Sequence, residues 1–116
     1  MAVFTIHINT DLERTLEETH ISNAFYTDDA LAHEIIVHIL RNGQAENVTG
    51  TVEMTIIKAD GTTATGTGSI SNSNQVHCTL PVAAYTCEGP LRIVIKLVTG
   101  NVRTTIASCA AYVREG

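Results

Sequence analysis

The chain has 116 residues, enough for one domain with a single hydrophobic core and too few for two. Hydrophobic residues make up 44% of the chain and charged residues 16%, and threonine is abundant, a balance that favours a β-rich globular domain. The formal net charge of −5, with seven basic residues scattered among twelve acidic ones, argues against a surface that binds nucleic acid. The sequence has neither a secretion-signal pattern nor an 18-residue uncharged run, so we expect folding in the cytoplasm and no contact with a membrane.

The N-terminal part begins with an alternating segment over residues 3–8, which predicts a first strand. Residues 10–20 have two interpretations. Thr10 and Glu13 have the spacing of a helix capping box, and Leu12 and Leu16 are one helical turn apart. The two leucines also share one face of an extended strand, so helix and strand both stay open for this segment.

Two strong strands follow. The run over residues 32–40 is apolar at nearly every position and ends at Asn42-Gly43, a dipeptide typical of tight turns, so it predicts a central buried strand. Residues 51–59 alternate apolar and polar side chains and reach a second turn signal at Asp60-Gly61. This segment is the clearest strand in the sequence.

Residues 62–70 contain Gly66 and Gly68 inside a strand pattern, which indicates a bulge, a bend or an edge position. Residues 75–80 form a strand with Cys78 on its inner face, and residues 91–98 and 102–113 form a final hairpin. About seven strands separated by turn signals, with no long helical pattern, predict a single all-β domain over residues 1–116, an antiparallel β-sandwich.

The three cysteines do not form a recognisable framework. Cys87 and Cys109 bracket the last hairpin, but their number is odd and no Cys-x-x-Cys spacing occurs. We therefore expect three free thiols that pack in the interior as small hydrophobic side chains.

Catalytic and metal-binding patterns are missing. His33 and His38 are five positions apart, an odd spacing that places them on opposite faces of a strand, so that they cannot share an ion without a bulge. His7, His20 and His77 lie in separate segments without ligand spacing. There is no nucleophile elbow and no phosphate loop, so we expect no enzyme activity, no metal and no cofactor.

A set of short features has the order and spacing of a known kind of domain and covers essentially the whole chain. These are Phe25-Tyr26-Thr27-x-Asp29, Arg41-Asn42-Gly43, Ala59-Asp60-Gly61-Thr62, the strand end at Leu80, Tyr85-x-Cys87-x-Gly89-Pro90, and the strand from Ile93 to Leu97. In these features the chain resembles the N-terminal domain of tailed-phage fibre and baseplate proteins of the baseplate upper protein type. Related domains begin phage head fibres.

The resemblance implies an immunoglobulin-like β-sandwich that docks on the virion, commonly as a homotrimer. The implied partners are the major capsid protein, for a head fibre or decoration protein, or tail and baseplate proteins. In such proteins a linker and a receptor-facing part usually follow this domain, whereas the sequence given ends at Gly116. The expectation is therefore either a free-standing decoration protein or the anchoring domain of a longer fibre.

Two groups of residues are candidates for an interface. The glycine-rich segment with Thr65, Gly66, Thr67 and Gly68 is a candidate sheet edge that a neighbouring protein covers. The aromatic anchors that we expect are Phe4, Phe25 and Tyr26. A carbohydrate-binding module is the alternative from another class, although a chain with no Trp, two Phe and three Tyr is poor in the aromatic residues that such modules use.

Overall fold

The computed structural model describes residues 5–21, 25–27 and 33–115. Seven strands in these ranges have five or more residues, in agreement with the number expected from the sequence, and three further strands have two residues each. The elements are β1 (Thr5–Asp11), β2 (Thr19–His20), β3 (Phe25–Tyr26), β4 (Glu34–Arg41), β5 (Gln44–Ala45), β6 (Thr51–Ile57), β7 (Thr63–Ser71), β8 (Gln75–Thr79), the 3-10 helix η1 (Val82–Tyr85), β9 (Gly89–Thr99) and β10 (Val102–Arg114).

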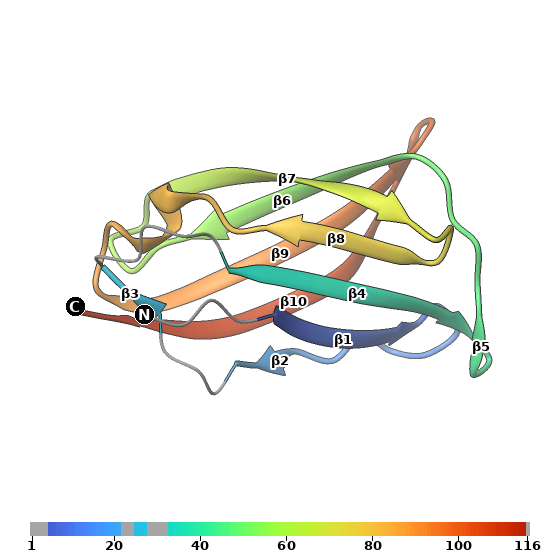
Figure 1. Cartoon of the computed structure of the whole chain (residues 1–116), viewed down its shortest axis with the longest axis horizontal. Coiled ribbons are helices and arrows are strands. Elements are labelled where there is room, and N and C mark those ends of the chain that lie inside the picture. Colours follow the sequence, from blue (N-terminus) through green and yellow to red (C-terminus); the bar gives the residue numbers. More distant parts are fainter. Residues whose placement is uncertain (1–4, 22–24, 28–32, 116) are drawn as a thin grey trace.

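The strands form one continuous sheet in the order β1-β4-β8-β7-β6-β9-β10-β2, with β5 beside β4 and β3 beside β10. The sheet folds over, so that β4 and β8 lie in front of β9 and β10 (Figure 1). Its two ends approach each other where the buried Thr10 hydroxyl donates a hydrogen bond to the Ile106 carbonyl over 2.6 Å. The predicted all-β sandwich is confirmed, and its curled ends give it a partly barrel-like form.

Three pairings are parallel, which the hairpin-based prediction of an antiparallel sandwich did not include. β1 runs parallel to β4, and β2 and β3 run parallel to β10. Parallel neighbours require a crossover connection. Here the chain leaves β1, lays β2 and β3 along β10, and returns to the opposite side of the core as β4 (Figure 1).

The core comes from the inward faces of the alternating strands. Ile35, Val37 and Ile39 of β4 are fully buried, and so are Ile93 and Ile95 of β9. Burial of each such side chain contributes about 1.5–3 kcal/mol relative to an exposed position. The predicted central strand at 32–40 is therefore confirmed for the part that the structure describes.

The glycine-rich strand β7 is not an edge strand, because it lies between β6 and β8. Gly66 and Gly68 are opposite Met54 of β6 and Cys78 of β8, respectively. A Cβ atom added at Gly68 would lie 2.8 Å from the Cys78 sulfur and 2.8 Å from a methyl carbon of Val52. The two glycines thus leave room for side chains from the neighbouring strands in the middle of the sheet.

The segment that was open between helix and strand forms neither a helix nor a long strand. Asp11 accepts a hydrogen bond from the N–H of Glu13 over 3.0 Å, and Thr10 uses its hydroxyl for the contact with Ile106. The capping-box interpretation is wrong because Thr10 belongs to β1 and its side chain is used inside the sandwich. After a turn, residues 15–18 run without regular structure to the short β2.

All three cysteines are free. Cys78 and Cys109 are fully buried as predicted, whereas Cys87 is only partly buried. Burial raises the pKa of Cys78 to about 12, with a further contribution from the nearby Cys109, and burial raises the pKa of Cys109 to about 11. No helix in the part of the chain that the structure describes is long and apolar enough to cross a bilayer.

Candidate interaction surfaces

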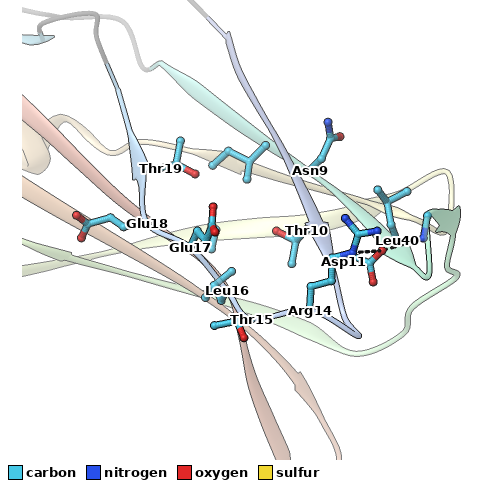
Figure 2. Close-up of a pocket in the computed structure, with 13 residues that line it drawn as sticks. Asn9, Thr10, Asp11, Arg14, Thr15, Leu16, Glu17, Glu18, Thr19 and Leu40 are labelled. Atoms are coloured by element: carbon cyan, nitrogen blue, oxygen red, sulfur yellow. Dashed lines mark hydrogen bonds and ion pairs between the residues drawn. The ribbon is translucent and has the colours of Figure 1, made fainter.

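A groove of about 420 Å³ lies between β1 and the segment that follows it. We call it the seam groove, because it lies where the two ends of the sheet meet. Figure 2 shows Thr10 on β1 and Glu17 on the following segment at either side of this space. The lining residues are Ile8, Asn9, Thr10, Asp11, Arg14, Thr15, Leu16, Glu17, Glu18, Thr19, Leu40, Gly43 and Ala107.

Main-chain groups on both walls of the seam groove lack partners in the sheet. Among the described strands, β1 pairs only with β4. The main-chain groups of successive strand residues point alternately to the two edges of the strand. Because the N–H of Leu12 bonds to the Leu40 carbonyl on the β4 side, the N–H and carbonyl of Asn9 and the N–H of Asp11 point to the edge away from β4. On the opposite wall, the main chain of residues 15–18 makes no hydrogen bond to any other described residue.

The carboxylates of the seam groove differ in their partners. Asp11 accepts hydrogen bonds from the N–H groups of Glu13, Gly43 and Asn42, and the first of these is the largest cause of a pKa below the ordinary value. Glu18 lies 3.9 Å from Arg92. Glu17 has no ion pair within the described ranges, so its negative charge is available to a ligand.

A second surface carries two exposed tyrosines and an arginine. Tyr26 is 41% exposed and Tyr112 is 48% exposed. Tyr26 is beside Arg114 in the β3–β10 pair, and the Arg114 guanidinium lies 5.9 Å from the centre of the Tyr112 ring. Phe25 and Val113, the other pair in this ladder, are buried, so the three side chains share the outward face. We call this set the Tyr–Arg patch.

The outward face of β1, β4 and β8 carries histidines that the sequence did not bring together. His7 and His38 stack with their centroids 5.3 Å apart, and the Nδ1 of His7 is 3.0 Å from the Nε2 of His38. His77 lies 3.0 Å from Glu34. Among residues 5–21, 25–27 and 33–115 no group of three or more His, Cys, Asp or Glu side chains has the arrangement of a metal site.

The predicted aromatic anchors have different environments. Phe4 lies outside the described residues. Phe25 is fully buried, with its ring centre 5.1 Å from that of His33 and 5.6 Å from that of Tyr85. Because Phe25 is part of the core, its side chain has no exposed surface with which to contact another protein. Tyr26, in contrast, lies on the surface.

The four candidates of the glycine-rich segment divide between the two faces of β7. Thr65 and Thr67 are exposed on the outward face. Gly66 and Gly68 face inward, toward Met54 and Cys78. The main-chain edge that was expected to accept a neighbour is already paired with β6 and β8, so of the four candidates only Thr65 and Thr67 offer accessible side chains.

Sequence reasoning missed the seam groove and two members of the Tyr–Arg patch, Tyr112 and Arg114. A signal for the patch was present, because Tyr112 and Arg114 flank the apolar Val113 in a strand pattern and must therefore point away from the core. No comparable signal exists for the seam groove, since its walls are placed by the parallel pairings of β1 with β4 and of β2 with β10.

These features define a small all-β domain with a filled core, a polar groove at its seam and an aromatic surface patch. No family model and no curated protein sequence matches the chain. Among solved structures, it is similar to the N-terminal domain of phage TP901-1 ORF48, with a TM-score of 0.61 and 11% sequence identity over 97% of this chain and 100% of that chain. The resemblance to an N-terminal domain of a tailed-phage protein is thus confirmed at the level of the fold.

Proposed function

We propose that this chain is a structural domain of a tailed-phage virion, whose role is to dock onto other virion proteins and not to catalyse a reaction. The observation that carries the proposal is the similarity in fold, over nearly the full length of both chains, to the N-terminal domain of a phage protein. The tail baseplate is our first choice for the place of attachment, because the sequence features resemble the baseplate upper protein type. Attachment to the capsid as a head fibre or decoration protein is the second.

The Tyr–Arg patch is our candidate for the docking surface. Tyrosine and arginine are enriched at protein interfaces, and exposed aromatic rings beside a guanidinium are typical of the few residues that dominate binding energy. Truncation of such a residue costs about 2 kcal/mol or more, which is roughly a thirtyfold loss of affinity. A homotrimer, as the resemblance implies, would present three copies of the patch to the particle and strengthen attachment through multivalency.

A carbohydrate ligand is a second candidate for the same patch. The tyrosine rings supply flat apolar faces, and Glu88, Tyr112, Arg114 and Glu115 line a shallow depression beside them. Such a set has the stacking surface and the hydrogen-bonding groups that a sugar requires. A glycan array with the purified protein separates this candidate from protein docking.

The test of the proposed function is the location of the chain in intact particles. We expect mass spectrometry and cryo-electron microscopy of purified virions to find it at the baseplate in a low copy number, whereas copies by the hundred would indicate the capsid. Tyr26→Ala combined with Tyr112→Ala should reduce incorporation, and Val82→Ala, at a 56% exposed position elsewhere, is the matched control. Absence of the unaltered chain from purified particles would refute the proposal.

A further inference from the structure

We propose that the seam groove binds an extended, basic peptide segment of a neighbouring virion protein, which adds a strand beside β1. The identity of the partner as a virion protein rests on the proposed function, but the mode of binding rests on the groove alone. Strand addition uses main-chain hydrogen bonds for affinity and side-chain pockets for specificity. The seam groove supplies both kinds of contact.

The main-chain contacts come from the two walls. The outer edge of β1 offers the N–H and carbonyl of Asn9 and the N–H of Asp11, and residues 15–18 offer main-chain groups from the other side; none of these groups is paired with another residue in the described ranges. The lining part of β1, Ile8–Asp11, spans about 13 Å at roughly 3.3 Å per residue. The volume of about 420 Å³ would hold about 14 water molecules at ~30 Å³ each, so a short extended segment has room to replace this water.

The side chains of the groove select the kind of segment. Leu16, which is 37% exposed, provides the main apolar contact of the groove, because Ile8 and Ala107 are buried, and Glu17 provides a negative charge without an ion pair in the described structure. The complementary ligand alternates apolar side chains with Lys or Arg. The net charge of −5 further favours a cationic segment over an acidic one.

The groove is preformed, because the β1 wall and the turn that leads to the second wall are held to the sandwich, and Glu18 of the second wall lies 3.9 Å from Arg92 of β9. The N–H of Leu12 bonds to the Leu40 carbonyl over 2.8 Å, and Arg41 forms an ion pair with Glu13 and another with Glu46 at 2.9 Å. Thr10 anchors β1 to β10 through Ile106. A preformed site reduces the ordering cost that a binding segment must overcome.

The experiment titrates the isotopically labelled protein with a heptapeptide of alternating lysine and valine, whose pattern is the same in both chain directions. We expect NMR chemical-shift changes at residues of the groove. When the peptide is saturating, hydrogen exchange at the main-chain N–H of Asn9 should be at least tenfold slower. The matched control peptide carries N-methyl groups on alternate residues, which removes main-chain donors and keeps the charge. If the control binds equally well, or if millimolar peptide gives no exchange protection, strand addition is refuted.

A charge-reversed variant tests the selection for basic segments. Glu17→Lys should weaken peptide binding roughly tenfold, which corresponds to one interaction of about 1.4 kcal/mol. Glu53→Lys, on the outward face of β6, makes the same change in net charge away from the groove and should bind like the parent. Equal weakening by both variants would contradict a local role for Glu17. If the chain binds the peptide but is absent from virions, the proposed function is refuted and the strand addition is not. If the chain is present in virions but does not bind the peptide, the strand addition is refuted and the proposed function is not.

Discussion

The central position of β7 predicts different costs for alanine at its two inward glycines. At Gly68 an added Cβ would meet the Cys78 sulfur and a Val52 methyl at 2.8 Å and the main-chain oxygen of His77 at 2.9 Å. Ordinary carbon contacts are about 3.5–4.0 Å, so each neighbour must move by at least about 0.6 Å. At Gly66 the single severe contact, at 2.1 Å, is with the terminal methyl of Met54. A methionine end can swing aside, whereas a strand carbonyl cannot.

The magnitudes follow from two opposing contributions. Overpacking a filled core lowers the free energy of unfolding by about 1–3 kcal/mol, and replacing a strand glycine by alanine raises it by about 0.5–1 kcal/mol. We therefore expect Gly68→Ala to lower the free energy of unfolding by about 0.5–2 kcal/mol and Gly66→Ala to change it by less than about 0.5 kcal/mol. At roughly 4 °C per kcal/mol, the difference is resolved by thermal denaturation.

The assay is urea denaturation followed by circular dichroism, with both variants beside the parent protein. Val52→Ala in the Gly68→Ala background relieves one of the three contacts, so the double variant should be more stable than the sum of the two single effects predicts. A Gly68→Ala protein as stable as Gly66→Ala would refute the close packing of β7 between its neighbours. It would also reopen the interpretation of this strand as an edge.

Three further predictions concern buried groups and charge. Tyr85→Phe removes the acceptor for a buried main-chain N–H, 3.1 Å from the phenol oxygen, and should destabilise the domain by about 1–3 kcal/mol in urea denaturation. A thiol reagent under native conditions should modify Cys87 rapidly and the buried Cys78 and Cys109 only after unfolding; fast reaction of all three would contradict the core packing. Because hydrogen bonds lower the pKa of Asp11 below 3.8, its stabilising effect is present above that value and is lost as the pH falls through the lower, folded-state pKa. Asp11→Asn should therefore reduce the loss of stability on acidification, and an unchanged pH profile would show that Asp11 makes no such contribution.

The strands and turns were predictable because they depend on local patterns. Alternation along residues 91–97 places Leu91, Ile93 and Ile95 in the core, as the structure has them. The turn after β4 uses positive φ angles of 52° at Asn42 and 82° at Gly43, which explains why this dipeptide marks the end of the strand. These features need no knowledge of which strands are neighbours.

The order of the strands was not predictable from the same patterns. Alternation reports which face of a strand is buried, but a glycine pair such as Gly66 and Gly68 fits an edge and a crowded centre equally well. In the structure β7 lies in the middle of the sheet, and Met54 and Cys78 occupy the space beside the two glycines. Likewise, residues 10–20 carry weak helix and strand signals, and the tertiary contact of Thr10 with β10 overrides both.

The two candidate surfaces arise from the same topological feature, the crossover that makes β1 parallel to β4. Because the chain crosses to β10 before it forms β4, it places β3 and its exposed Tyr26 next to Arg114. The same crossover leaves the outer edge of β1 without a paired strand among the described residues, and it forms the other wall of the seam groove from residues 15–18. An antiparallel hairpin between β1 and its neighbour would remove the need for this crossover and with it both surfaces. The crossover is therefore the structural basis of both candidate surfaces, and the core strands hold it in place.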